Sequence, residues 1–580
     1  MEKKLSQLVN ALNIELTSVD RDPVITDLCF DSRSVTSGSL FFALPGTHVH
    51  GNTFITDAIN RGALAVVYQD ELPVEAVKTA KSQQTAPVFI KVQDARFAMS
   101  PIAAAFYDNP SSKLAVIGVT GTEGKSSTVS FIWQLLRLMG KKAGFISTVQ
   151  YSLGGDAIAN PEHQTTPEAP IVQRQLYQMV QAGCHYAVVE SSSHGLSVRT
   201  NRLGNVLFDC AVWMNVTHEH LEFHGTFEQY RHDKANLFRA LDTHNHEKLI
   251  DGQKVTIPAF GVINLEDPSA EYFVKSTKCP VYGFTTRGAA GRGQGFLNSN
   301  PPRIPYLLAD KIAGSKGISF ELEGSGKLIG TVGVGNIGTV DISNIGTVGV
   351  GNIGTVDIGS IGTVGADSGT IAVESPVSGA FNVYNITAAL LTVSQITQLP
   401  IQEVAGKTQF LEPITGRMTP ICQGQPFEVI VDYAHTPSSF ETIFPPLKKR
   451  VTGRLIALFG SGGERDIKKR PEQGKIAAHW CDMVFLADED PRGEDPQTLL
   501  EMIAQGARTE GKVSEETGLY LIPNRQEAIR KAFSLAREGD IVLLLGKAHE
   551  NSIIYKDYIM PYDEIKEAQN ALAEMGFKSR

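Results

Sequence analysis

A buried strand that runs into a glycine-rich turn, a lysine and a helix start is the feature that most constrains the fold of this chain. It occupies Leu114 to Val129. Gly118, Gly121 and Gly124 carry no Cβ, so backbone amides there are expected to approach a polyphosphate where the following helix begins. The spacing departs from the usual loop, since five residues rather than four separate Gly118 from the Gly124-Lys125 pair. The segment predicts a nucleotide phosphate site within an α/β fold.

The residues around this turn supply the groups that a nucleotide needs. Lys125 matches the phosphates in charge, and the Ser126 hydroxyl can ligate Mg²⁺. The loop residues expected to bind ATP are Gly118, Thr120, Gly121, Thr122, Glu123, Gly124, Lys125, Ser126 and Ser127. The helix is supported by apolar residues at the spacing of one helical face, namely Ile132, Leu135, Leu136 and Met139. Gly140 stands where it can end this helix.

Length and composition narrow the class of protein. A chain of 580 residues exceeds what one hydrophobic core serves, so several domains are expected. The formal net charge of −9 offers no broad basic surface, which argues against nucleic acid and for small anionic ligands in a local cleft. Six scattered cysteines without a Cys-x-x-Cys pair favour reduced thiols over a metal site. No stretch of about 18 apolar residues occurs, so we expect a cytoplasmic protein without a membrane partner. We also expect a monomer, although the sequence does not settle the oligomeric state.

The order of strands and helices predicts three α/β domains. Residues 1–101 alternate short strands and helices, as in a small α/β domain. Residues 102–412 repeat strand, loop and helix, which predicts a doubly wound parallel sheet with ligands at the carboxyl ends of its strands. Residues 413–580 form a third, Rossmann-like unit. The strands expected in these units are 40–44, 186–189, 429–431, 455–458, 483–486 and 541–545.

One segment does not fit this scheme. The tetrapeptide Ile-Gly-Thr-Val begins at 329, 337, 345, 353 and 361, so residues 329–364 form an insert of period eight. Its flanks, 318–322 and 370–374, read as two strands with an expanded turn between them. Because a long surface loop costs little closure entropy, we expect a tolerated insert without a chemical role. A β-meander, a disordered loop and a docking strand for a partner are the alternatives.

Polar residues follow the phosphate loop at two further places. Glu190 ends the strand 186–189, a usual position for a carboxylate that holds Mg²⁺ beside a nucleotide, although a surface glutamate would look the same. Further on, Thr226 and Gln229 form a capping box, so a helix is expected to start there with Lys234 two turns inside it. Taken alone, Lys234 reads as a solvated helix lysine.

The context of Lys234 changes that interpretation. His220 and Lys234 are fourteen residues apart, and their segment resembles the His to carbamylated-lysine arrangement of the Mur ligases, the enzymes that build the peptide stem of peptidoglycan. The resemblance extends over nearly the whole chain. Its motifs are Gly118–Ser126, Glu190–Leu196, Phe381–Asn385, Gly416–Met418, Val431–Pro437, Gly460–Asp466 and Leu545–Glu550. Glu123 stands where the family more often has asparagine, and the period-eight insert has no counterpart.

The resemblance implies an ATP-dependent amide ligase with a UDP-binding N-terminal domain, a central ATP-binding domain and a C-terminal amino-acid-binding domain. It would add a diamino acid, the third residue of the stem, to UDP-MurNAc-L-Ala-D-Glu through an acyl phosphate. Lys125 and Mg²⁺ held by Ser126 and Glu190 would neutralise the gathered anions. A second Mg²⁺ would be held by His220 and by Lys234 carbamylated with CO₂, since an unmodified ammonium would repel the metal.

The same resemblance assigns the remaining substrate contacts. Asn385 is expected by the adenine, Arg417 by the phosphates and Asp432 by the ribose or the hinge. The residues expected to bind the UDP-sugar peptide are Ser32, Thr165, Thr166, Ser192 and Arg202. Arg199 competes with Arg202 for the last of these roles, and Arg202 before a leucine matches slightly better.

The signal for the incoming amino acid is mixed. The residues expected to meet it are Arg465, Asp490, Arg492, Gly546 and Glu550. Family members that use diaminopimelate typically read Asp-Asn-Pro-Arg at this loop and lysine-using members replace the arginine, whereas this chain keeps Arg492 but has Glu489-Asp490. Arg492 would pair with a distal carboxylate, unless Asp490 or Glu494 neutralises it. Because Glu489, Asp490 and Glu550 would repel a further anion, the charge balance favours lysine or ornithine over diaminopimelate.

Two other functions remain open. A folylpolyglutamate synthetase shares the ATP loop and the carbamylated lysine, but the block Asp31-Ser-Arg33 and the serine run after Glu190 argue against it. The second is a nucleotide-binding protein without catalysis that docks a partner through the insert. The residues that disfavour it are the intact Lys125, Glu190, His220 and Lys234.

Overall fold

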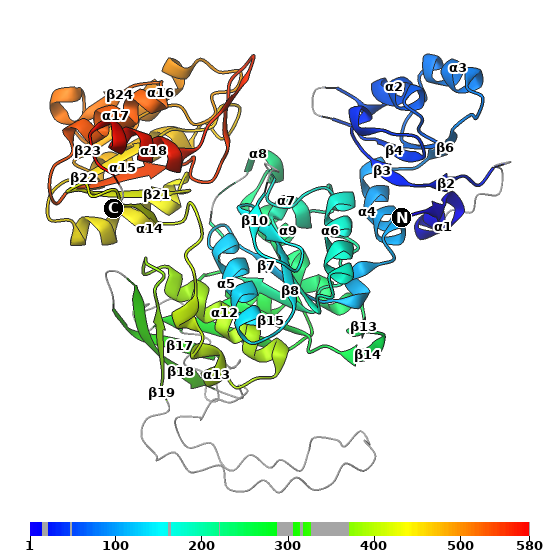
Figure 1. Ribbon diagram of the computed structural model, residues 1–580, viewed down its shortest axis with the longest axis horizontal. Coiled ribbons are helices and arrows are strands. Elements are labelled where there is room, and N and C mark those ends of the chain that lie inside the picture. Colours follow the sequence, from blue (N-terminus) through cyan, green and yellow to red (C-terminus); the bar gives the residue numbers. More distant parts are fainter. Residues whose placement is uncertain are drawn as a thin grey trace, which may run out of the picture.

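The computed structural model describes residues 1–13, 21–46, 49–160, 164–217, 219, 221–286, 306–313, 317–325 and 370–578. Three α/β units follow one another along the chain, and the N-terminal and C-terminal units lie on opposite sides of the central one (Figure 1). The period-eight insert 329–364 lies outside the described residues, as does His220. Among the described helices, none is long and apolar enough to cross a membrane.

The N-terminal unit is built on four parallel strands in the order β3-β4-β5-β6. Its elements are β1 (Lys3–Lys4), α1 (Leu5–Val9), η1 (Asn10–Leu12), β2 (Val24–Ile25), β3 (Asp27–Cys29), η2 (Ser32–Ser34), β4 (Ser39–Ala43), η3 (Gly51–Phe54), α2 (Ile55–Asn60), β5 (Ala65–Tyr68), α3 (Val74–Ser82), β6 (Val88–Lys91) and α4 (Ala95–Phe106). The strand expected at 40–44 is β4. Helix α4 packs into the core of this unit and continues past residue 101, where the sequence suggested a boundary.

The central unit contains a sheet with the order β10-β9-β8-β11-β7-β12-β15-β16-β17-β18-β19 within the described residues. Its elements are η4 (Pro110–Lys113), β7 (Ala115–Thr120), α5 (Lys125–Leu138), β8 (Ala143–Ile146), β9 (Gln150–Ser152), β10 (Ile158–Ala159), α6 (Ala169–Gln181), β11 (Tyr186–Glu190), α7 (Ser193–Leu196), β12 (Cys210–Trp213), α8 (Leu221–His224), α9 (Phe227–Ala240), η5 (Leu241–Thr243), β13 (Glu247–Ile250), β14 (Gln253–Thr256), β15 (Phe260–Asn264), α10 (Ala270–Val274), β16 (Val281–Thr286), β17 (Tyr306–Ala313), β18 (Ile318–Ser325), β19 (Thr370–Ser375), α12 (Asn382–Thr397), α13 (Ile401–Ala405) and η7 (Thr408–Phe410).

Strands β8, β11, β7, β12, β15, β16 and β17 run parallel, and antiparallel strands finish both edges of this sheet. Successive residues of β7 point to opposite faces, so Ile117 packs beneath α5 and α12 while Val116 packs against α6 and α9. The expected doubly wound arrangement is therefore present (Figure 1). The two flanks of the insert are strands β18 and β19, which pair antiparallel at the edge of the sheet, as expected.

The C-terminal unit has the strand order β20-β21-β25-β22-β23-β24, parallel except for β20. Its elements are β20 (Thr419–Ile421), β21 (Glu428–Asp432), α14 (Pro437–Arg450), β22 (Leu455–Phe459), α15 (Lys469–Trp480), β23 (Met483–Leu486), α16 (Pro496–Thr509), η8 (Glu515–Thr517), β24 (Leu519–Leu521), α17 (Arg525–Leu535), β25 (Ile541–Leu545), β26 (Ser552–Ile554), β27 (Ile559–Pro561) and α18 (Glu564–Glu574). Helices α14, α15 and α16 cover one face, and α17 and α18 cover the other. All four strands expected here are present.

Candidate active site

One cavity of about 1470 Å³ opens between the central and C-terminal units. It is larger than the roughly 300–1,000 Å³ of a typical single-ligand pocket, so it can hold several substrates side by side. The expected site residues that line it are Thr122, Glu123, Gly124, Lys125, Ser126, Ser127, Thr165, Thr166, Glu190, Ser192, Arg202, Lys234, Asn385, Arg417, Asp432, Arg465, Asp490, Arg492 and Glu550. Segments far apart in the sequence thus meet around a common space.

The phosphate loop joins β7 to the first turn of α5. Gly124 caps the helix in the left-handed region at φ 81°, and a Cβ there would lie 2.6 Å from Asn385 Oδ1. Asn385 therefore sits against the loop itself. The Lys125 ammonium donates to the Thr122 carbonyl at 2.7 Å and lies beside the amides that begin α5. A cation and a helix N-terminus together favour a phosphate group.

Three of the glycine-loop residues do not line the cavity. Gly118 and Thr120 lie within β7, and Gly121 directly follows that strand. A Cβ on Gly118 would lie 2.4 Å from Leu237 Cδ1, so this glycine lets α9 pack closely against the sheet. The expectation that Gly118 lets the backbone approach a phosphate is replaced by a packing role.

Glu190 ends β11 and is almost fully buried. Its Oε1 accepts from the Ser126 hydroxyl at 3.1 Å. Its Oε2 accepts from the Ser147 hydroxyl and from the Thr148 amide, the latter at 2.9 Å. A carboxylate and a hydroxyl beside the phosphate loop form an oxygen donor pair of the kind that Mg²⁺ takes in nucleotide sites.

Lys234 lies in α9 and is 1 % exposed, so it is not the solvated helix lysine that it would be in isolation. Its Nζ donates to the Gly121 carbonyl at 2.6 Å and stands 4.5 Å from the centre of the Tyr230 ring. Burial, reinforced by nearby Lys125, holds the pKa of Lys234 well below its usual value, which favours a neutral amine. The expected capping box is half formed, because Thr226 accepts from the Gln229 amide while the Gln229 side chain bonds Asp233.

The linker between the central and C-terminal units reaches the phosphate loop. Arg417 donates to the Ser126 hydroxyl at 3.3 Å and stacks over the Tyr433 ring at 4.9 Å. Asp432 ends β21, and its two oxygens accept from the Met418 and Ala434 amides, both at 2.8 Å. Asp432 therefore braces the linker, which agrees with the hinge alternative.

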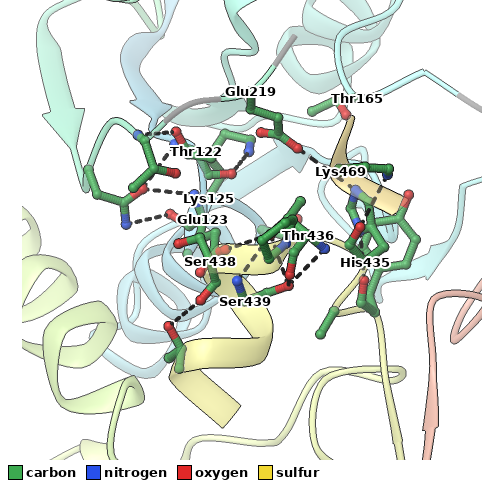
Figure 2. A pocket seen from close by; sticks show the side chains of 18 of the residues that line it. Thr122, Glu123, Lys125, Thr165, Glu219, His435, Thr436, Ser438, Ser439 and Lys469 are labelled. Carbon is green, nitrogen blue, oxygen red and sulfur yellow. Dashed lines mark hydrogen bonds and ion pairs between the residues drawn. The ribbon is translucent and has the colours of Figure 1, made fainter. Parts of the chain in front are cut away.

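Further contacts between these units surround the loop (Figure 2). The Thr436 hydroxyl, which also caps α14, donates to Glu123 Oε1 at 3.1 Å. Burial, with nearby Glu219 adding repulsion, raises the pKa of Glu123 to about 7. His435 Nε2 lies 3.9 Å from Glu219, and burial lowers the pKa of His435 to about 4, so this imidazole is neutral near pH 7. His435 and Thr436 lie in the Val431–Pro437 motif, but the sequence analysis assigned neither of them a role.

The residues expected to hold the UDP-sugar peptide fall into two places. Thr166 donates to the Glu190 carbonyl at 2.8 Å and accepts from the Ser192 amide at 2.9 Å, so this part adjoins the phosphate site. Arg202 also lines the cavity, whereas Arg199 stacks on an aromatic ring and donates to a backbone carbonyl. Ser32 lies in η2 of the N-terminal unit and is not among the residues that line the cavity.

The pocket expected for the amino acid contains a buried lysine that the sequence argument left out. Lys547 donates to Asp490 at 2.9 Å and also bonds Glu550. The expectation that Glu489, Asp490 and Glu550 would repel a further anion left out this ammonium, which Asp490 and Glu550 share. The sequence contained a sign of this contact, because Lys547 and Glu550 both lie in the Leu545–Glu550 motif.

Neither of the two carboxylates expected to neutralise Arg492 pairs with it. Glu494, a possible partner, instead forms a two-pronged pair with Arg470 at 2.7 and 2.8 Å. Asp490 is taken by Lys547, and among the described residues neither Arg492 Nε nor Glu489 Oε2 has a hydrogen-bond partner although both are buried. Gly546 does not line the cavity, but a Cβ there would lie 2.8 Å from Glu489 Oε2.

Comparison with known proteins places this architecture in a family. Residues 24–107, 119–393 and 416–548 match models described as Mur ligase family, catalytic domain; Mur ligase middle domain; and Mur ligase, glutamate ligase domain. The UDP-N-acetylmuramyl-tripeptide synthetase of Treponema denticola is 47 % identical over 98 % of both chains, and that of Treponema pallidum is 48 % identical over 94 % of this chain and 93 % of its own.

A solved structure agrees with these relatives. That of a UDP-N-acetylmuramoyl-L-alanyl-D-glutamate–2,6-diaminopimelate ligase superposes with a TM-score of 0.56 at 25 % identity, covering 99 % of this chain and 100 % of that one. The fold and the phosphate site define an ATP-dependent ligase. The chain belongs to the Mur ligase family, and its relatives of nearly half-identical sequence are tripeptide synthetases rather than folylpolyglutamate synthetases.

Proposed function

We propose that this enzyme joins a diamino acid to UDP-MurNAc-L-Ala-D-Glu as the third residue of the peptidoglycan stem, at the expense of ATP. The observation that supports it best is the shared cavity, in which the phosphate loop, the buried Lys234, Thr166 beside Ser192 and the Arg492 loop face one space. An acceptor carboxylate, a nucleotide and an amine must meet in one place for such a reaction.

The chemistry is an acyl transfer in two steps. A carboxylate oxygen of the D-glutamate residue bonds to the γ-phosphorus of ATP and ADP leaves, which gives an acyl phosphate. The free α-amine of the diamino acid then bonds to the acyl carbon, and inorganic phosphate leaves as the amine loses a proton. Lys125 and Arg417, which both reach the phosphate loop, would stabilise the negative charge that gathers in the first step.

The donors at Ser126 and Glu190 fit Mg²⁺, because one hydroxyl and one buried carboxylate face each other beside the loop. When bound there, Mg²⁺ would supply charge neutralisation for the phosphates. The hydrogen bonds from Ser147 and Thr148 hold the Glu190 carboxylate in position for this task.

Lys234 is proposed to carry a carbamate. Its neutral amine can bond to the carbon of CO₂ and release a proton, which converts a cationic side chain into an anionic one. Burial and the lowered pKa support this step, since only the unprotonated amine is a nucleophile. Together with His220, the carbamate would hold a second Mg²⁺.

The third amino acid is proposed to end in a plain amine, lysine or ornithine, and the support for this now rests on Glu489. Among the described residues its buried Oε2 has no hydrogen-bond partner, while Asp490 and Glu550 are occupied by Lys547. Glu489 can bind the distal ammonium that all three amino acids carry, but it would repel the distal carboxylate that only diaminopimelate adds. We expect a higher kcat/KM with lysine or ornithine than with meso-diaminopimelate. Glu489→Gln should lower kcat/KM for the preferred amino acid about tenfold or more, the size of a lost charged hydrogen bond.

Each unit is proposed to serve one substrate, with residues 1–101 for the UDP moiety, 102–412 for ATP and 413–580 for the amino acid. The enzyme is proposed to act as a cytoplasmic monomer. The decisive experiment is phosphate release from ATP with UDP-MurNAc-L-Ala-D-Glu and lysine, ornithine or diaminopimelate in turn. Release with none of them would favour a non-catalytic nucleotide-binding protein, and a tenfold preference for diaminopimelate would mean that Arg492 dominates the pocket.

A further inference from the structure

A second cluster of metal-ligating side chains lies away from the active site. Asp209 immediately precedes β12, His244 follows η5 and His246 precedes β13. Asp209 bonds the amide of Val116 at the beginning of β7, whereas the phosphate loop follows the end of β7 at Thr120. The cluster and the ATP site are therefore at opposite ends of the same strand.

The three side chains converge on one carboxylate oxygen. One potential ligand atom from each residue lies within 4.8 Å of the others. Asp209 Oδ1 is 2.9 Å from His246 Nδ1 and 3.4 Å from His244 Nε2. Bonds of about 2.0–2.1 Å to a tetrahedral Zn²⁺ separate its ligands by roughly 3.3 Å, so small shifts would bring all three into coordination.

Neighbouring groups orient these atoms in the way that metal sites require. His246 Nε2 lies 2.8 Å from the Leu241 carbonyl, so it carries a proton and donates there. The second oxygen of Asp209 accepts from the Val116 amide and from Lys248 Nζ, each at 2.9 Å. Oδ1 of Asp209 and Nδ1 of His246 are thereby left facing each other.

With a neutral His246, hydrogen bonding alone satisfies this cluster poorly. A lone pair on His246 Nδ1 would repel the Asp209 oxygen at 2.9 Å unless a cation or a second proton stood between them. His244 makes contacts of only 3.4 Å to Asp209 and 3.5 Å to Thr243, although its side chain is only 11 % exposed. These distances exceed the ordinary 2.7–3.2 Å or so of an N–H···O bond. One divalent cation would give both rings and the carboxylate a strong partner.

We propose that Asp209, His244 and His246 bind a divalent transition metal, with Zn²⁺ as the ion that two imidazoles and one carboxylate suit best. The exposed edge of His244 gives water access as the fourth ligand. The ion would act as a clamp, because it joins the start of β12, the turn after α9 and the β13–β14 hairpin.

Zn²⁺ binding to the full chain tests this site. The protein is stripped with a chelator, returned to excess Mg²⁺ and titrated with Zn²⁺ by calorimetry, with thermal unfolding followed in parallel. His244→Gln removes one ligand at a partly exposed position. His185→Gln is the matched control, because His185 also pairs with an aspartate, Asp251, at 2.8 Å.

Wild type and His185→Gln are expected to bind one Zn²⁺ at least about tenfold more tightly than His244→Gln does, and to gain thermal stability from it. Co²⁺ in wild type should give the visible absorption of a four-coordinate site, a readout that does not depend on any variant folding. Equal Zn²⁺ binding by all three proteins would overturn the proposal. So would a ¹⁵N spectrum in which His246 keeps protons on both ring nitrogens at saturating Zn²⁺, since this indicates an ion pair without a metal.

Discussion

Lys234 shows how the surroundings of a residue decide its chemistry. As a free ammonium it would be a buried cation, and the hydrogen bond to the Gly121 carbonyl gives it no compensating charge. As a carbamate it would be an anion that a metal can neutralise. The position therefore suits a neutral amine or the proposed carbamate better than an ammonium.

Lys234→Ala is accordingly expected to lose at least about 3 kcal/mol of transition-state stabilisation, or a hundredfold or more in kcat. Acetate or formate should partly restore phosphate release, because a small carboxylate can occupy the space of the missing carbamate. The rescue should depend on the concentration of the acid and should be absent in wild type. Near wild-type turnover in the unsupplemented variant would contradict the assignment of this residue to the metal.

Glu123 makes the stability of the protein depend on pH. Folding raises the pKa of Glu123 from 4.5 to about 7. Between pH 4.5 and pH 7 the carboxyl group is therefore protonated in the folded chain and ionised in the unfolded chain. Unfolding then releases a proton, and stability falls as pH rises from about 4.5 to about 7. Above pH 7 the carboxylate is charged in both states, and the free-energy cost of burying this charge in the folded protein is fully present.

Glu123→Gln should therefore raise the free energy of unfolding at pH 8 by about 1 to 2 kcal/mol and leave it nearly unchanged at pH 4. This change in free energy is smaller than the full pKa shift of Glu123 would give, because part of the side chain reaches solvent. Denaturant unfolding at both pH values measures it, with exposed Glu403→Gln as the control. A variant that is less stable at pH 8 would show that the carboxylate is held ionised.

The sequence identified which residues belong to the site more readily than it identified what each of them does. The motifs gave Lys125, Glu190 and Arg492, since each follows a recognisable strand or loop. The pairing of Lys547 with two carboxylates depends on how β25 and the loop after β23 meet, and residues 57 positions apart carry no local sign of contact. Gly118 was misread for a similar reason, because the atom that excludes its Cβ belongs to α9.

At the scale of the element, regular strands were the most predictable part. Strands β21, β22, β23 and β25 are continuous apolar runs with glycine or polar loops after them, which is the pattern of parallel strands buried on both faces. The boundary near residue 101 was less predictable, because α4 is apolar on the side that packs under the N-terminal sheet and nothing in its sequence marks which unit it joins.

The insert between β18 and β19 is expected to be dispensable. Joining Ile329 directly to Gly365 removes the repeated units, and the loop-closure free energy changes by only about 1 to 2 kcal/mol. The two strands should stay paired, since their own hydrogen bonds and core residues are untouched. Turnover and ATP affinity should remain within a few-fold of the parent. A folded deletion variant that no longer releases phosphate would show that the repeats serve the active site.

At the scale of the whole molecule, polar side chains link the described parts of the three units. Glu168 accepts from Arg96 of the N-terminal unit at 3.0 Å and from Arg202 of the central unit at 2.9 Å. This pair of bonds links α4 to the arginine expected at the UDP substrate, and the proposed role of Ser32 would require it to approach the cavity across the same junction. The orientation of the N-terminal unit is thus coupled to the substrate residues.

Glu168→Gln should raise KM for the UDP substrate several-fold with a smaller change in kcat, because the two arginines lose the anion that holds them together. A loss of about 1 to 3 kcal/mol in stability is also expected. Glu71→Gln, which breaks the exposed pair with Lys91, is the control and should change neither quantity measurably. An unchanged KM in the Glu168 variant would mean that the other contacts of α4, such as the bond from Asn201 to the Phe97 carbonyl at 2.9 Å, orient the N-terminal unit.

The ends of β18 and β19 lie next to each other at the outer edge of the central sheet, remote in the order of strands from β7 and its phosphate loop. A connection between these two adjacent strand ends can become longer or shorter without moving β18 or β19. In the gene, each eight-residue unit is a whole number of codons, so slippage of the replication machinery within the repeats would preserve the reading frame. Isolates of the source organism should therefore carry alleles that differ in the number of units, all encoding a working ligase, and the locus would serve as a length marker for typing strains.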